Sequence, residues 1–177
     1  MSIVLVTGSC GLVGSEASAF FSKKGFDIIG IDNNSRKLFF GKDGDVSWVR
    51  RKLEKNIKNY KHYNIDISEP NAVKKIFKKY KKNIKLVIHS AAQPSHDWAK
   101  NNIFKDFDVN ARGTINLLEM TKNYCFDAPF IFMSTNKVYG DNPNKLPLVE
   151  KSTRWEIKNN HSFKNGITEN MSIDNCV

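Results

Sequence analysis

The sequence predicts an α/β protein built on a doubly wound parallel sheet that is incomplete on its C-terminal side. Short β-branched runs alternate along the chain with segments of helical period. The first run leads directly into glycines spaced three apart. Each later run ends in small or polar residues, and right-handed crossovers bring such ends to one edge of a parallel sheet.

Composition sets the class of protein. The 177 residues can form one domain with a core, and 40% hydrophobic and 26% charged residues are typical of a globular chain. No apolar run reaches the roughly 20 residues that span a bilayer, and the N-terminus lacks the features of a signal peptide. Cys10, Cys125 and Cys176 are far apart and form no metal-ligand spacing. We therefore expect a cytoplasmic protein with reduced thiols and no metal.

The net charge of +10 raises nucleic acid and anionic membranes as partners. The lysines are spread over expected helix faces and do not alternate with aromatic residues. This pattern favours a solvated face, so we expect neither partner, although a basic nucleic-acid-binding protein is kept as an alternative. The lysines in question are Lys74, Lys75, Lys78, Lys79, Lys81 and Lys82.

The first expected strand, residues 3–7, runs into a turn with Gly8, Gly11 and Gly14 and then into a helix over residues 11–24. A strand, a glycine turn and a helix in this order present backbone N–H groups to a pyrophosphate. Glycine permits the sharp turn, the close approach of the phosphates and the close packing of the helix. The stretch predicts a dinucleotide site, whereas the simpler alternative is a turn that binds nothing.

A second buried strand, residues 28–31, ends in Asp32. A carboxylate at this point accepts hydrogen bonds from the adenosine ribose and repels a 2′-phosphate, so it favours NAD over NADP. Arg36 lies close enough in sequence to weaken that preference. The alternative for Asp32 is an ordinary turn residue.

Residues 33–59 form a long insertion with helical character from residue 46 onward, which suggests either a functional loop or a covering flap. A third strand is expected over residues 60–67. The next helix opens with Ser68 as N-cap and Pro70 in its first turn.

The fourth strand, residues 86–89, ends in His89 and then in small residues. We expect His89 to be a packed core histidine rather than a base. One long helix should cover residues 101–124, where Asn110 and Thr114 interrupt the apolar face, and a fifth strand residues 129–133. We place the dinucleotide-binding domain at residues 1–140. Residues 141–177 show no regular pattern and read as an irregular tail that begins a substrate-binding region.

At this point the chain resembles the extended short-chain dehydrogenase/reductases that act on nucleotide sugars, a family with a Rossmann-type fold. The resemblance rests on six motifs in order, of which the last is Ser134-Thr135-x-x-Val138-Tyr139-Gly140. The first five are Thr7-Gly8-x-x-Gly11-x-x-Gly14, Asp32-Asn33, Asp66-Ile67, Ala91-Ala92 and Asn110-x-x-Gly113-Thr114.

Within that family the chain is most similar to the CDP-paratose 2-epimerases, also called CDP-tyvelose epimerases. Three stretches carry this similarity, covering residues 92–98, 134–141 and 165–170. Asn136 and Lys137 replace the Asp-Glu pair with which the 4,6-dehydratases of the family eliminate water.

The resemblance implies NAD as cofactor and a nucleotide sugar, CDP-linked, as substrate. A sugar carbon would be oxidised transiently to a ketone and reduced again on its other face, with Thr135 hydrogen-bonded to the reacting oxygen. The positions assigned to the sugar nucleotide are Pro94, Ser134, Asn136 and Lys137. The positions assigned to NAD are Gly8, Cys10, Gly11, Leu12, Val13, Gly14, Asp32, Asn33, Arg36, Asp66, Ile67, Ala91, Ala92, Gln93 and Asn110.

The family also uses a Tyr-x-x-x-Lys pair as base, and none of the five tyrosines here has lysine at the fourth following position. The chain therefore resembles the N-terminal half of a family member, and we expect it to be inactive alone. We also expect an open sheet edge with exposed apolar side chains. Besides the nucleic-acid-binding protein, two alternatives remain: an NAD-binding module without catalysis, and a relative of the 4-epimerases or dehydratases. Whether a full-length form is a homo-oligomer is left open.

Overall fold

The computed structural model of the chain describes residues 2–135 and 138–173. It divides into two compact units, Met1–Met133 and Ser134–Val177, and each is described by itself below. No helix among the described residues is long and apolar enough to cross a membrane.

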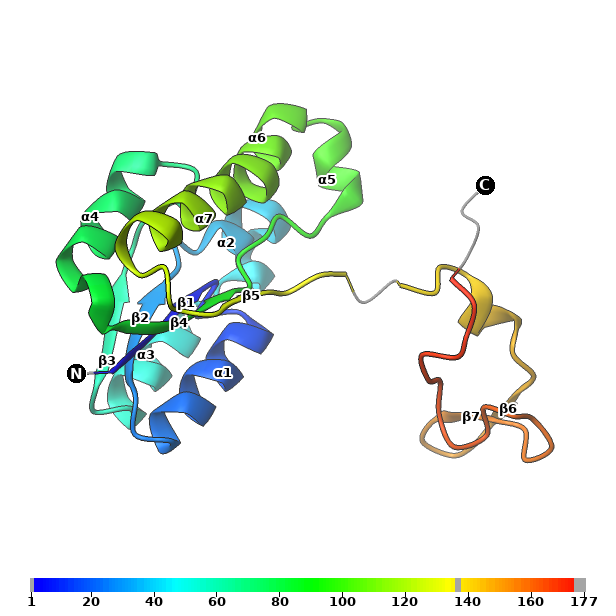
Figure 1. Ribbon diagram of the computed structural model, residues 1–177. Helices are drawn as coiled ribbons and strands as arrows, with labels where there is room; N and C mark the ends of the chain where they lie inside the picture. The colour runs from blue at the N-terminus through cyan, green and yellow to red at the C-terminus, as the bar shows by residue number, and fades with distance from the viewer. Residues whose placement is uncertain (1, 136–137, 174–177) are drawn as a thin grey trace. The chain divides into compact units, whose positions relative to one another are not determined.

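The first unit is built on a five-stranded sheet in the order β3-β2-β1-β4-β5, and every neighbouring pair is parallel (Figure 1). The order reverses between β1 and β4, which is the switch point where doubly wound sheets bind ligands. This architecture confirms the predicted fold class. The strands are β1 (Ile3–Thr7), β2 (Asp27–Ile31), β3 (Tyr60–Tyr63), β4 (Ile84–His89) and β5 (Phe130–Phe132).

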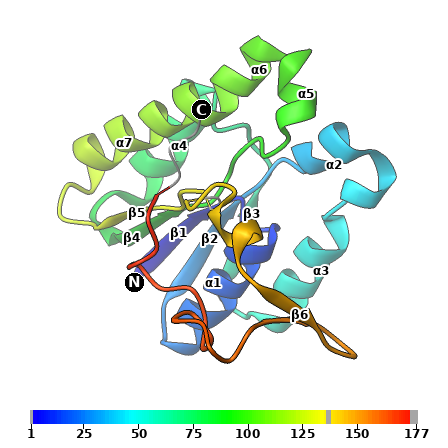
Figure 2. The ribbon, with the colours of Figure 1, turned by 90° about the vertical axis from the view of Figure 1, so that its right-hand side faces the viewer.

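Helices cover both faces of the sheet (Figure 1). One face carries α1 (Leu12–Lys23) and α3 (Ser47–Asn56), and the other carries α4 (Pro70–Tyr80) and α7 (Gly113–Tyr124). Two short helices, α2 (Ser35–Phe40) and α5 (His96–Lys100), follow β2 and β4 on the side where the strands end (Figure 2). The remaining helical turns of this unit are η1 (Gly41–Gly44), η2 (Lys81–Asn83), α6 (Ile103–Phe107) and η3 (Asp108–Arg112).

The alternation of side chains along β1 explains the two helical layers. Ile3 and Leu5 point into the core beneath α4 and α7, while Val4 and Val6 point into the core beneath α1 and α3. All four are completely buried. A strand buried on both faces needs an unbroken apolar run, which is why the N-terminal segment carries one.

At the other side of the sheet, β5 is an edge strand. Its Ile131 and Phe132 are exposed, and among the described residues β5 pairs with β4 alone, as expected for an edge strand. This exposure confirms the predicted open edge.

Three local expectations differ from the structure. The third strand stops at Tyr63 because its pairing with β2 ends there, so residues 64–67 form a loop. Ser68 is not the N-cap of α4: its hydroxyl donates to Asp66 at 2.7 Å, and Glu69 takes the cap position without a side-chain bond. The single helix expected from residue 101 begins at Ile103 and is widened by a π-helical turn, Asp108–Arg112.

The π-helical turn has a local cause. The hydroxyl of Thr114 donates to the carbonyl of Asn110 at 2.6 Å. The side chain of Asn110 bonds both backbone groups of Gln93, accepting from its N–H at 2.9 Å and donating to its carbonyl at 3.2 Å. Such a widened turn commonly occurs at functional sites, since it frees groups for contacts outside the helix.

The second unit holds more regular structure than the irregular tail that the sequence suggested. A 3-10 turn, η4 (Asn142–Lys145), precedes an antiparallel pair, β6 (Leu148–Glu150) and β7 (Trp155–Ile157). Three-residue strands are too short to show a period-two pattern, which is why the sequence did not reveal them.

A directed chain of buried hydrogen bonds joins β1, β4 and α7. The Thr114 hydroxyl donates to Asn110, so it must accept from His89 Nε2 at 3.0 Å. His89 Nδ1 therefore accepts from the Thr7 hydroxyl at 2.7 Å, and Thr7 in turn accepts from the backbone N–H of Ala91 at 3.3 Å. His89 is 1% exposed, which confirms the packed core histidine. The donors and acceptors of these hydrogen bonds follow one direction only while His89 is neutral.

The pH dependence of stability follows from this neutral histidine. Burial lowers the pKa of His89 from 6.5 to about 4. Between these values the unfolded state binds a proton on this histidine and the folded state does not. The contribution of His89 to the free energy of unfolding is therefore complete above pH 6.5 and is lost as the pH falls toward 4. The loss should be on the order of 1 kcal/mol per pH unit within this window.

Urea unfolding of the wild type and of His89→Gln over this pH range measures the effect. The variant lacks the titrating group, so it should be less stable near neutral pH, and its deficit should shrink as the pH falls. Parallel losses of stability in the two proteins would show that His89 is not the group responsible.

Candidate functional site

The glycine turn lies at the carboxyl end of β1 and is packed from both sides. The backbone N–H of Gly8 donates to the carbonyl of Ile31 at 2.8 Å, and that of Gly11 donates to the carbonyl of Gly8 at 2.9 Å. Gly8 has φ +65°, and a Cβ there would lie 2.7 Å from the nitrogen of Ala91. A Cβ on Gly14 would lie 2.2 Å from the carbonyl oxygen of Gly8. Both positions therefore require glycine.

The turn leads directly into the first turn of α1, with Gly11 as N-cap and no side chain capping the helix. The first backbone N–H groups of a helix have no partners within it, and the helix dipole adds partial positive charge there. Leu12 and Val13 begin this helix, and Leu12 is 85% exposed. This surface of bare N–H groups suits an anion such as a pyrophosphate.

Asp32 flanks the turn on the β2 side. Its Oδ2 accepts from the backbone N–H of Cys10 at 2.9 Å, and its Oδ1 accepts from that of Asn34 at 2.8 Å. Asn33 accepts from the N–H of Ser35 at 3.1 Å, which shapes the following turn. These bonds orient the carboxylate and leave lone pairs free for the hydroxyls of a ligand.

A pocket opens beside Asp32. Its walls include three residues that no sequence pattern singles out, Ser47 and Arg50 from α3 and His62 from β3. Arg50 is held by Glu54, with 2.9 Å between guanidinium nitrogen and carboxylate oxygen. Arg36, the arginine that the sequence singled out, lies instead over the ring of Phe40 at 4.8 Å.

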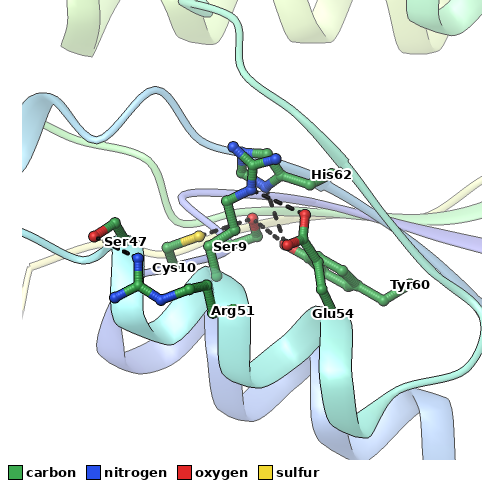
Figure 3. Close-up of polar contacts among 8 residues, drawn as sticks. Ser9, Cys10, Ser47, Arg51, Glu54, Tyr60 and His62 are labelled. Atoms are coloured by element: carbon green, nitrogen blue, oxygen red, sulfur yellow. Dashed lines mark hydrogen bonds and ion pairs between the residues drawn. The ribbon is translucent and has the colours of Figure 1, made fainter.

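Hydrogen-bonded side chains support this pocket (Figure 3). Ser9 Oγ lies 2.9 Å from the Tyr60 hydroxyl, which lies 3.3 Å from His62 Nδ1. Burial raises the pKa of the Tyr60 hydroxyl, so it stays protonated. Burial and the nearby Asp32 charge raise the pKa of the Cys10 thiol to about 11. Neither group is an activated base or nucleophile at neutral pH.

Asp66 follows β3 in the loop of residues 64–67. Its Oδ1 accepts from the backbone and hydroxyl of Ser68, and its Oδ2 lies 2.7 Å from Lys105 Nζ. Burial opposes ionisation, but the bonds from Lys105 and Ser68 outweigh it and lower the pKa of the Asp66 carboxyl. Ile67 is buried, and its side chain would lie 2.6 Å from a Cβ on Gly113. Lys105 is a fourth residue that sequence reasoning missed, after Ser47, Arg50 and His62.

The segment after β4 flanks the turn on the other side. Ala91 lies against Gly8, while Ala92 and Pro94 are exposed. The side-chain amide of Gln93 is buried and donates to Asp106 at 2.8 Å. Together with the bonds from Asn110, this contact fixes the segment, so Gln93 and Asn110 shape the site from behind it.

The four remaining predicted positions lie beyond this unit. Ser134 and Thr135 begin the second unit, and the structure does not place them relative to the glycine turn. Asn136 and Lys137 lie outside the described residues. Among the described residues no group of His, Cys, Asp or Glu could hold a metal ion, and Cys10 and Cys125 are free thiols.

Comparison with known proteins identifies the family of the chain. The model of the NAD dependent epimerase/dehydratase family matches residues 4–164. CDP-paratose 2-epimerase of Salmonella typhi is 32% identical over 171 residues, which cover 97% of this chain and 46% of the relative. The chain thus spans about half the length of the curated relatives it matches.

Solved structures show the same fold. The UDP-Glc/GlcNAc 4-epimerase of Campylobacter jejuni superposes with a TM-score of 0.65 at 25% identity, covering 87% of this chain and 43% of that one. The UDP-glucose 4-epimerase of Thermus thermophilus, solved in complex with NAD, gives a TM-score of 0.53 at 29% identity, covering 69% of this chain and 34% of that one. From the family match over most of its length, the chain belongs to the NAD dependent epimerase/dehydratase family.

Proposed function

We propose that this chain binds NAD along the carboxyl edge of its sheet and supplies the cofactor-binding part of a nucleotide-sugar epimerase. The observation that carries the proposal is the glycine turn, in which Gly8 and Gly14 stand where any Cβ would meet backbone atoms. A turn this tight, set before an uncapped helix N-terminus, is the arrangement that backbone recognition of a pyrophosphate requires.

The neighbouring groups suit the adenosine half of NAD. The Asp32 carboxylate can accept from the ribose hydroxyls, and its charge opposes a 2′-phosphate. Arg50 and His62 line the same pocket. Burial lowers the pKa of His62, so this imidazole offers no cation at neutral pH, and Arg50 is already paired with Glu54. This balance supports NAD as the cofactor.

We assign Asp66 and Ile67 to the adenine. The Asp66 carboxylate is held ionised by Lys105 and Ser68, which keeps it an acceptor for an exocyclic amine. Ala91 is the position nearest the turn on the β4 side, where the nicotinamide half would lie. When bound, NAD would supply the group that accepts a hydride from the sugar and later gives it back in the same site.

For the substrate we propose a CDP-linked sugar inverted at C2. The support is the 32% identity to CDP-paratose 2-epimerase over 97% of this chain. In this assignment Thr135 hydrogen-bonds the reacting sugar oxygen, and Pro94, Ser134, Asn136 and Lys137 contact the sugar nucleotide. The second candidate is a UDP-sugar 4-epimerase, which the similarity to the Campylobacter jejuni and Thermus thermophilus enzymes favours.

Replacing Asp32 tests cofactor recognition. Asp32→Asn keeps the size of the side chain but removes its charge and one of the two acceptors for the Cys10 and Asn34 N–H groups, so the Kd for NAD should rise about ten- to hundredfold. The preference for NAD over NADP should narrow, because the repulsion of the 2′-phosphate is lost. Calorimetric titration with each dinucleotide measures both effects.

Asp27→Asn is the matched control, since Asp27 begins the same strand at its opposite end. It should bind NAD as the wild type does. Equal NAD affinity in the wild type and Asp32→Asn would contradict the assignment of Asp32. Salt-sensitive binding of an oligonucleotide without NAD binding would support the nucleic-acid alternative instead.

The division between binding and turnover gives another prediction. No tyrosine of the chain belongs to a Tyr-x-x-x-Lys pair, so the 177-residue chain should bind NAD and leave CDP-paratose unchanged. NMR of the sugar anomeric protons, with a complete CDP-paratose 2-epimerase as positive control, measures conversion. Formation of CDP-tyvelose by the purified chain would show that another group acts as the base.

A further inference from the structure

Two short helices that start on opposite sides of the glycine turn meet through their aromatic side chains. α2 follows β2, and α5 follows β4, the strand on the other side of β1. The ring centroids of Phe39 in α2 and Trp98 in α5 are 4.7 Å apart, with the rings tilted by 58°. The two helices lie next to each other at the end of the sheet where the strands finish (Figures 1 and 2).

The arm that carries Phe39 is closed firmly at its base. The Asn34 side chain donates to Asp45 at 3.1 Å and accepts from the backbone N–H of Val46 at 3.0 Å. Lys37 Nζ lies 3.1 Å from Asp45. These bonds tie the two ends of residues 34–46 together, so the arm is a preformed loop that projects from β2.

The arm that carries Trp98 is also fixed at its base. The backbone N–H of Ala91 donates to Thr7 at 3.3 Å, which joins the arm to β1. Gln93 is bonded to Asp106 and to Asn110, and Ser95 caps α5 by accepting from the N–H of Trp98 at 3.2 Å. Trp98 is therefore presented from a rigid support.

These contacts link the glycine turn, the two arms and their aromatic contact in one continuous ring. The ring runs from the turn through Asp32 into α2, crosses from Phe39 to Trp98, and returns through α5 and Ala91 to Thr7. Among residues 2–135, all described, no hydrogen bond or ion pair joins α2 to α5. The aromatic contact is thus the link of the ring that opens at the lowest cost.

We propose that Phe39 and Trp98 form a gate that closes over a dinucleotide bound on the glycine turn and must part for it to enter or leave. This proposal rests on NAD binding as proposed above. Phe39 and Trp98 then slow the exchange of bound NAD. Slow exchange suits an epimerase, because each turnover returns the cofactor to its starting state.

Stopped-flow mixing with NAD tests the gate in a background in which Trp98 is the only tryptophan. Trp48→Phe and Trp155→Phe create this background, and both side chains are mostly exposed. Trp98 fluorescence then reports association and dissociation. Phe39→Ala should raise both rate constants about two- to tenfold, since it removes an aromatic contact from the closed state alone.

Phe39→Leu should give a smaller increase because it keeps apolar contact with Trp98. Phe40→Ala is the control, since Phe40 lies in the same helix and packs under Arg36. Trp98→Ala, followed by the fluorescence of NADH, should match Phe39→Ala measured in the same way, and the double variant should be no faster, because both remove one contact. Circular dichroism verifies that each variant is folded.

The outcomes separate the gate from the proposed function. If NAD binds to the wild type and the rate constants of Phe39→Ala equal those of Phe40→Ala, the gate is wrong and the cofactor site stands. If only the dissociation rate constant rises, Phe39 is a wall of the site rather than a gate. If no folded variant and no wild type binds NAD, the proposed function itself fails, and the gate fails with it.

Discussion

The site depends on one steric constraint, the close approach of two backbone segments at the carboxyl end of β1. Gly8 lies against the backbone of Ala91, and Gly14 lies against the carbonyl of Gly8. These contacts let α1 start directly above the strand, so its free N–H groups face the edge of the sheet. A methyl group at either glycine would push the helix or the β4 segment away, and the pyrophosphate surface would be lost.

Buried polar bonds hold the rest of this edge in position. His89 links Thr7 of β1 to Thr114 of α7, and Asn110 links the same helix to Gln93. Each donor in this set of hydrogen bonds has an acceptor. The arrangement is therefore specific, since a buried polar group without a partner would lower the stability of the fold. The loops that surround the site therefore start from rigid supports, although they lie outside the sheet.

The proposed assignment separates cofactor binding from chemistry. The groups proposed to contact the dinucleotide lie in the first unit and include the Asp32 carboxylate and the ion pair between Asp66 and Lys105. Thr135, the group proposed to contact the reacting sugar, begins the second unit. The internal contacts that position the Asp32 and Asp66 carboxylates are all made within the first unit.

The sequence by itself determined the parallel sheet, the glycine turn and the place of Asp32, because these follow from local patterns: apolar runs, glycine spacing and a residue at a strand end. It also placed His89 in the core. Only the tertiary structure decided that Arg50 rather than Arg36 lines the pocket, that Lys105 pairs with Asp66, and that α2 meets α5. These contacts join residues far apart in the chain, and no local pattern records which distant side chain a folded loop will meet.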